Sequence, residues 1–177
     1  MKKKKQLKKT KWWLDPVFRF VLLSGITLLV LLLVTSLRGV ESVLIQVTSL
    51  ILSKILSLLQ IPYESRFLDS QFAFQILDGT KLKYMIVPDC TGIYPFSILT
   101  SFIIGYPTTW KHKGTGLLFA VLLTGTVNFL RLTLLIQIGR ISLSSFHLWH
   151  TLIWQSSFLL LIVGFYFGWT AWIAKNQ

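Results

Sequence analysis

The sequence predicts an all-α polytopic membrane protein with about four transmembrane helices, an amphipathic interfacial helix and a small β-hairpin on the outer face of the membrane. Of the 177 residues, 53% are hydrophobic. A soluble domain of this length has too little interior to bury so much apolar side chain. Several apolar runs approach the ~20 residues that a helix needs to cross a bilayer. We therefore expect one membrane-embedded domain over residues 1–177.

The positive charge gathers next to the first apolar run. The chain has a formal net charge of +12, and residues 1–13 hold a dense cluster of lysines. Such a cluster beside an apolar span is held on the cytoplasmic side and is attracted by anionic lipid. No basic face interleaved with aromatic residues appears elsewhere. We therefore expect membrane lipids as partners of this tail, and no nucleic acid.

Four apolar runs predict the transmembrane helices, at residues 17–37, 91–106, 116–138 and 149–173. Residues 41–61 differ, because polar side chains recur there in steps of three and four and form one stripe on a helix. The stripe consists of Ser42, Gln46, Ser49, Ser53, Ser57 and Gln60. Such a helix either lies in the membrane interface or spans the membrane with its stripe facing a partner. Pro62 ends it.

Residues 66–88 predict a hairpin on the outer face. Two β-rich segments, residues 72–77 and 81–87, are separated by Asp78-Gly79, and Asp-Gly between such segments favours a tight turn. If residues 41–61 do not cross the membrane, the "WKHK" loop and the C-terminus lie in the cytoplasm and the hairpin lies outside. This topology obeys the positive-inside rule. It places the "WKHK" loop and the hairpin on opposite sides of the membrane.

Three chemically capable residues then fall at a similar depth near the outer face. Cys90 begins the second span, Arg131 lies about two turns before the outer end of the third, and His150 begins the fourth. An ionisable residue inside a span is a functional candidate by default. Asn128 precedes Arg131 by three residues and shares its helix face. Residues 90–173 thus form the candidate catalytic part of the chain.

Cys90 is the one cysteine of the chain, so it forms no intramolecular disulfide and belongs to no multi-cysteine metal site. Lone cysteines usually behave as small hydrophobic residues. Cys90, however, lies between Asp89 and Thr91-Gly92 at a predicted helix N-terminus. The partial positive charge there favours the thiolate, so this position suggests a nucleophilic cysteine. His150 is four residues before Trp154, so the two share a face. A histidine there is suited to general acid–base work.

The motifs "DCTGIYP", "NFLRL" and "HTLIWQ" resemble, in order and spacing, those of the exosortase and archaeosortase family of membrane cysteine transpeptidases. The chain looks most like the compact exosortase H-type branch. The resemblance covers about residues 40–173. It implies the cytoplasmic membrane of a prokaryote, with the active site facing outward. It implies a peptidase that recognises a C-terminal sorting signal, made of a short motif, a transmembrane helix and a basic tail, on exported proteins.

The resemblance also implies roles for the residues. Cys90 would form an acyl-enzyme, Arg131 would stabilise the thiolate or the oxyanion, and His150 would protonate the leaving amine. The acyl group would pass to an acceptor such as an amine-bearing lipid. No metal or cofactor is implied. The residues expected to bind substrate or support the site are Asp89, Thr91, Gly92, Asn128, Trp154 and Gln155.

Two other classes of function stay open. The same thiol would serve an acyltransferase that acts on a lipid. Alternatively, the chain is a non-catalytic assembly or secretion subunit in which Asn128 and Arg131 hold helices together. Rapid reaction of Cys90 with a thiol probe near neutral pH favours an enzyme, because a cysteine that only packs reacts slowly.

Overall fold

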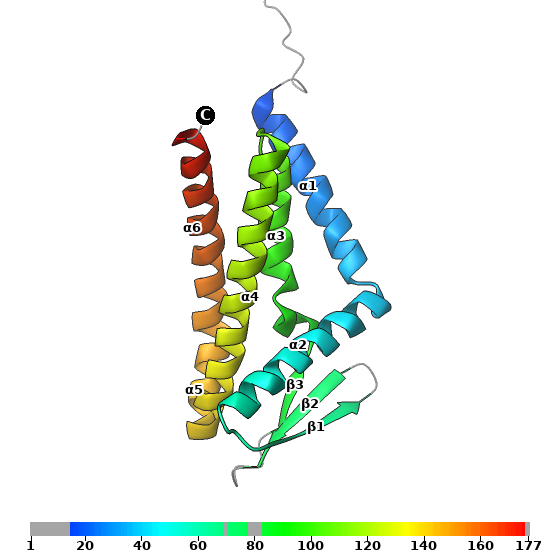
Figure 1. Cartoon of the computed structure of the whole chain (residues 1–177), viewed down its shortest axis with the longest axis vertical. Helices are drawn as coiled ribbons and strands as arrows, with labels where there is room; N and C mark the ends of the chain where they lie inside the picture. The colour runs from blue at the N-terminus through cyan, green and yellow to red at the C-terminus, as the bar shows by residue number, and fades with distance from the viewer. Residues whose placement is uncertain (1–14, 69–70, 78–82, 176–177) are drawn as a thin grey trace, which may run out of the picture.

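The computed structural model describes residues 15–68, 71–77 and 83–175. In this part of the chain a long helical bundle carries a small β-sheet at one end (Figure 1). Numerous large apolar side chains on the helices are exposed, as expected of a bundle whose solvent is lipid. The predicted fold class, a helical polytopic membrane protein, is confirmed. The basic tail, residues 1–13, lies outside the described residues.

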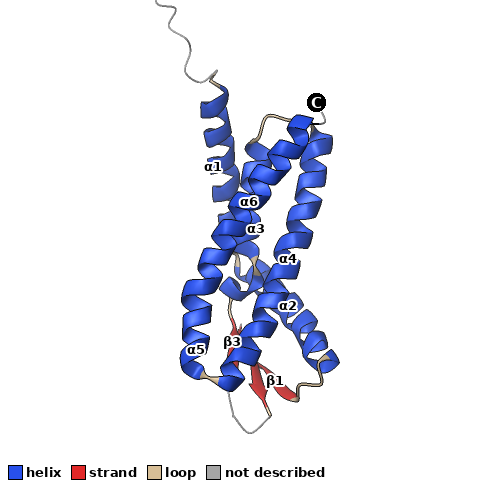
Figure 2. Cartoon of the chain, turned by 90° about the vertical axis from the view of Figure 1, so that its left-hand side faces the viewer, coloured by secondary structure: helices blue, strands red, loops and turns tan. Residues whose placement is uncertain are grey.

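Four helices run along the long axis of the bundle (Figures 1 and 2). They are α1 (Pro16–Thr35), α3 (Ile93–Gly105), α4 (Trp110–Ile141) and α6 (Trp154–Lys175). The start of α1, the connection between α3 and α4 and the end of α6 lie at one end of the bundle, and the sheet lies at the other (Figure 1). We call these the open end and the sheet end of the bundle.

Among the described residues, four helical stretches are long and apolar enough to cross a membrane: Pro16–Thr35, Arg38–Leu58, Trp110–Ile141 and Leu143–Lys175. The number agrees with the prediction, but the assignment differs for one of them. The predicted span at residues 91–106 is the 13-residue helix α3. Its rise of about 20 Å is shorter than the ~30 Å hydrocarbon layer.

Helix α2 (Arg38–Leu58) is the predicted amphipathic helix. Its buried face consists of Ile45, Thr48, Ser49, Leu52 and Leu56. Both views show α2 running obliquely from the end of α1 toward the sheet end (Figures 1 and 2). Although α2 is long enough to cross a membrane, it does not return the chain to the open end.

The predicted hairpin is present as the antiparallel strands β2 (Gln71–Ile76) and β3 (Lys83–Ile86). Its Asp78-Gly79 connection lies outside the described residues. The structure adds a strand that the sequence analysis missed, β1 (Tyr63–Leu68), which pairs with β2 to give a three-stranded sheet in the order β1-β2-β3. Strand β1 contains an exposed ion pair between Glu64 and Arg66, and this polar pattern hid it.

Two apolar cores follow one another along the bundle. The core at the sheet end joins α2, the sheet and α4, and it contains Leu52, Phe74, Ile86, Cys90 and Leu132 among its buried residues. The second core joins α3, α4 and α6 around Leu99, Ile103 and Trp169. A Cβ atom on Gly116 would lie 2.7 Å from the Trp169 ring, so the close approach of α4 and α6 there requires glycine.

Candidate functional site

Cys90 lies in a short 3₁₀ helix, η2 (Pro88–Thr91), that connects β3 to α3. Its backbone N–H donates to the Val87 carbonyl at 2.8 Å. Gly92 follows in the left-handed region with φ 75°, where a side chain is strained. The chain therefore turns before α3 begins at Ile93. Cys90 belongs to this turn and not, as the sequence analysis expected, to the first turn of the long helix.

Asn128 of α4 fixes this turn. Its Nδ2 donates to the Cys90 backbone carbonyl at 2.8 Å, and its side chain is only 1% exposed. A Cβ atom on Gly92 would lie 3.0 Å from the Asn128 Cγ, so glycine is also what allows the amide to approach. Asn128 Oδ1 is buried and has no hydrogen-bond partner in the described part of the chain. Asn128 thus connects α4 directly to the residue that carries the thiol.

Arg131 lies one turn further along α4 and is 8% exposed. Its guanidinium carbon lies 5.7 Å from the centre of the Phe158 ring of α6, within the range of a cation–π interaction. Within the described ranges, the one ion pair is that of Glu64 and Arg66. The exposed Asp89 interacts with Arg131 electrostatically, but no described carboxylate forms an ion pair with it. A buried cation without a carboxylate partner is costly. This cost favours a role in which the guanidinium meets an anion during function.

His150 lies in a π-helical segment, η3 (Trp149–Ile153), between α5 (Leu143–Leu148) and α6. Its ring stacks on Phe146, with centroids 5.6 Å apart and an interplanar angle of 19°. Single π-helical turns inside helices are frequent at functional sites, because the wider turn redirects a side chain. The packing on Phe146 holds the imidazole in place.

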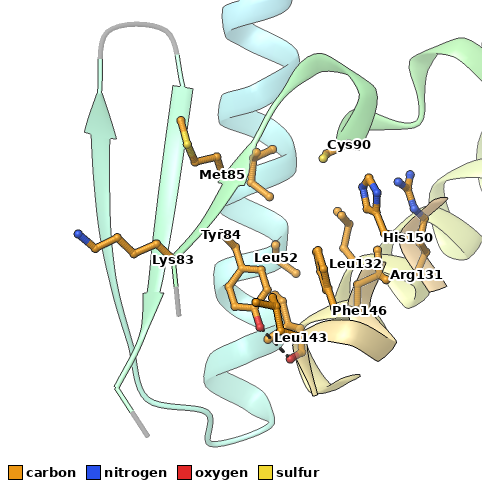
Figure 3. A pocket seen from close by; sticks show the side chains of 13 residues that line it. Leu52, Lys83, Tyr84, Met85, Cys90, Arg131, Leu132, Leu143, Phe146 and His150 are labelled. Atoms are coloured by element: carbon orange, nitrogen blue, oxygen red, sulfur yellow. Dashed lines mark hydrogen bonds between the residues drawn. The ribbon is translucent and has the colours of Figure 1, made fainter. Parts of the chain in front are cut away.

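A cavity of about 340 Å³ brings Cys90, Arg131 and His150 together. Figure 3 shows the three side chains at one end of it, with the imidazole and the guanidinium both extending toward the Cys90 end. They come from three elements that are far apart in the sequence: η2, α4 and η3. The rest of the lining is mainly apolar and includes Leu52, Tyr84, Leu132, Leu135, Leu143 and Phe146.

The arrangement holds the groups needed for nucleophilic catalysis: a thiol, a cation and a titratable imidazole. In the part of the chain that the structure describes, no hydrogen bond joins the three side chains to one another. Catalytic hydrogen bonds are often long without substrate and shorten when it binds. The site can therefore complete its contacts around a bound carbonyl group.

The other predicted site residues lie outside this cavity. Asp89 is exposed, and Thr91 and Gly92 line a second cavity, of about 260 Å³. The Thr91 hydroxyl donates to the Pro88 carbonyl at 2.6 Å, so it stabilises the turn. Trp154 is buried, and its Nε1 has no hydrogen-bond partner among the described residues.

Nothing is described for the side chain of Gln155. His147 is exposed and is not among the cavity residues.

Two aromatic residues of the cavity were missed in the sequence. The Tyr84 hydroxyl donates to the Ile136 carbonyl at 3.3 Å, and its ring meets the edge of Phe146 with centroids 5.8 Å apart. Phe146 is four residues before His150, a helical spacing that could have identified it. Tyr84 gave no such signal, because Ile136 and Phe146, its partners at the cavity, lie more than fifty residues away.

Comparisons of this chain with family models, with curated proteins and with solved structures find no match.

Proposed function

We propose that the chain is a membrane-embedded cysteine transpeptidase that cleaves C-terminal sorting signals of exported proteins at the outer face of a prokaryotic cytoplasmic membrane. One observation carries the proposal: Cys90, Arg131 and His150 line a single cavity. They come from separate elements, and Asn128 holds the backbone of the cysteine. The motif resemblance described above supports the same reaction and the same three residues.

The reaction has two halves. The Cys90 thiolate attacks the scissile carbonyl carbon, and a C–S bond forms while the negative charge moves to the carbonyl oxygen. Arg131, a buried guanidinium with five N–H donors, stabilises that oxyanion. The C–N bond then breaks, and His150 donates a proton to the departing amine. The product of this half is a thioester on Cys90.

In the second half an acceptor amine, such as that of a lipid headgroup, attacks the thioester carbonyl. An amide bond forms, the C–S bond breaks, and the thiolate returns. His150 accepts the proton that the attacking amine loses, which restores its starting state. If water attacks in place of the amine, the same steps release a carboxylic acid, and the enzyme acts as a protease.

The thioester provides the test. Tagged wild-type chain and Cys90→Ala are expressed in cells that contain exported proteins, and the membranes are denatured in acid to preserve acyl groups. Hydroxylamine then releases thioester-bound groups from the purified chain for mass spectrometry. We expect a polypeptide hydroxamate, ending just before an apolar C-terminal helix, from the wild type and none from Cys90→Ala.

Other outcomes identify the alternatives. A released fatty-acyl hydroxamate contradicts the peptidase and indicates a lipid acyltransferase. The absence of any released group, together with normal processing of exported proteins by Cys90→Ala, contradicts a cysteine enzyme and favours the assembly subunit. Immunoblots verify that both chains reach the membrane in equal amounts. Cys90→Ala removes one sulfur from the core at the sheet end, which is a small loss of packing.

A further inference from the structure

The cavity beside Cys90 is chemically divided along its length. Cys90, Arg131 and His150 lie at one end, whereas Tyr84 and Leu143 lie at the other (Figure 3). Phe146 lies between them and stacks on His150. Lys83 also contributes to the lining, but its exposed side chain points away from the cavity. The groups that could meet a charge are therefore those of the reacting end, and the far end is apolar.

Aromatic side chains border one side of the far end, where Leu143 is exposed. The Tyr84 hydroxyl donates to the Ile136 carbonyl at 3.3 Å, so its proton is not available to donate to a group in the cavity. The Tyr84 and Phe146 rings are in contact, with centroids 5.8 Å apart. These contacts join β3, α4 and α5 across the bottom of the cavity. The space beyond Cys90 is therefore bordered on one side by packed aromatic rings, against which an apolar side chain can pack.

The volume is sufficient for such a side chain. The cavity measures about 340 Å³, whereas an apolar cavity of ~150 Å³ already binds a benzene ring. Burial of a charged side chain there would cost free energy, because the far end has no partner for it. Burial of an aliphatic or aromatic side chain would be favourable in proportion to its apolar area.

We infer that this cavity receives a large apolar side chain, from the substrate residue whose carbonyl carbon is attacked by Cys90. The inference rests on the proposed function, and it adds the side-chain class that the site selects. A side chain on that residue begins close to the thiol sulfur once the C–S bond has formed, so the neighbouring space is the space it must occupy. Leu135 and Leu143 are then specificity-determining residues.

Peptidyl electrophiles test this side-chain preference directly, since they contain the residue that Cys90 attacks but no leaving peptide. Purified full-length chain in lipid nanodiscs is treated with biotinylated chloromethyl ketones of alanine, leucine, phenylalanine and glutamate, which alkylate a thiolate and release chloride. Each rate is divided by the rate with iodoacetamide. We expect the leucine and phenylalanine probes to label Cys90 at least about tenfold faster than the alanine or glutamate probe.

Variants that fill the cavity should remove this preference. Leu135 lines the cavity and is 4% exposed, so Leu135→Phe should bring the ratio of phenylalanine to alanine probe near one. Leu143→Trp is a second variant, because Leu143 lines the cavity but is 59% exposed and tolerates a larger residue. The matched control is Leu134→Phe, on the same helix but 39% exposed and outside the lining. It should keep the wild-type ratio.

The outcomes test the side-chain preference and the proposed function separately. Equal rates for all four wild-type probes, or the same loss of preference in Leu134→Phe, overturn the inference. A long-chain alkyl chloromethyl ketone that reacts fastest also overturns it and indicates a lipid substrate. If Cys90 reacts with neither iodoacetamide nor any probe, the proposed function itself fails.

Discussion

Arg131 is a buried cation that forms no ion pair with a carboxylate in the described ranges. Replacing it with lysine keeps the charge but removes the planar fork that can bond two oxygens at once. If Arg131 stabilises an oxyanion, Arg131→Lys should lower the rate of acyl-enzyme formation by about 10²-fold. The measurement is the initial rate at which the hydroxylamine-sensitive adduct appears.

The control for this change is Arg140→Lys. Arg140 lies on the same helix and donates to the Gln137 side chain at 3.0 Å, away from the cavity. We expect Arg140→Lys to stay within about twofold of the wild type, because the half-buried Arg140 does not line the cavity and lysine keeps its charge. A near-normal rate in Arg131→Lys would reduce Arg131 to an anchor that needs only its charge.

The two histidines near the sheet end differ in their position relative to the cavity, so mutation of each can be compared. His150 lines the cavity and stacks on Phe146. His147 is exposed on α5 and lies roughly perpendicular to the same ring, with centroids 5.9 Å apart. We expect His150→Ala to lower acyl-enzyme formation by 10² to 10⁴-fold, the usual range for a general acid. His147→Ala should retain most of it. The reverse result would mean that the π-helical turn presents a different residue to the substrate.

At the scale of elements, the sequence predicted the long helices but not the short turns that interrupt them. Hydropathy and helical spacing located α1, α2, α4 and α6, because burial in lipid or in the bundle leaves a regular pattern. The pattern could not reveal that Gly92 adopts a positive φ, since glycine is compatible with a continuing helix as well. For this reason the second span was predicted longer than α3 is, and Cys90 was placed at its start.

For the cavity, too, some features could be predicted from the sequence and others could not. Cys90, Arg131 and His150 were identifiable singly, because each is a chemically unusual residue for its position. Their convergence depends on the turn at Gly92, on the Asn128 contact and on the π-helical segment, none of which has a period in the sequence. Tyr84 and Leu52 could not be assigned to the cavity, because they reach it through long-range packing.

The need for glycine in the turn after Cys90 can be tested by adding one methyl group at Gly92. Gly92 has φ 75°, and an added Cβ would lie 3.0 Å from the Asn128 Cγ. We expect Gly92→Ala to destabilise the turn by at least about 1–2 kcal/mol, the cost of the left-handed conformation for a residue with a Cβ atom. Because the strain acts on the neighbour of Cys90, the rate of iodoacetamide labelling of Cys90 should change together with thermal stability in nanodiscs.

Gly164→Ala is the matched control. Gly164 lies within α6, and an added Cβ there would meet no atom within 4 Å. Alanine is preferred over glycine in a helix by about 0.5–1 kcal/mol, so this variant should be as stable as the wild type or more so, with unchanged labelling. Equal effects of the two substitutions would contradict the strain argument for Gly92.

At the scale of the whole molecule, the two ends of the bundle differ in chemistry. The open end holds the start of α4, where Lys113 donates to the Ile104 carbonyl at 2.5 Å and lies over the Trp110 ring. The predicted "WKHK" loop is therefore the first turn of a helix. The sheet end holds the cavity, the β-sheet and α5 (Figures 1 and 2). A cysteine transpeptidase that acts on exported proteins requires the sheet end to face outward.

Helix α4 provides the means to test which way the bundle faces. It has 32 residues, a length of about 48 Å, which exceeds the ~40–45 Å of a bilayer with its headgroups. Lys111 in its first turn and Ser144 beyond its last residue are both exposed, so they lie on opposite sides of the membrane if α4 crosses it. Basic residues next to a span favour the cytoplasm, so Ser144 should be outside.

The test uses Cys90→Ala as background, with Lys111→Cys or Ser144→Cys as the one thiol. In intact cells stripped of their outer envelope, an impermeant maleimide should label Ser144→Cys and should label Lys111→Cys only after the membrane is opened. Labelling of both from outside would mean that α4 does not cross, because its length leaves no other arrangement. Labelling of Lys111→Cys alone would keep the bundle as described but turn the cavity toward the cytoplasm. The thiol would then meet proteins before export, and sorting at the outer face would be ruled out even if Cys90 is catalytic.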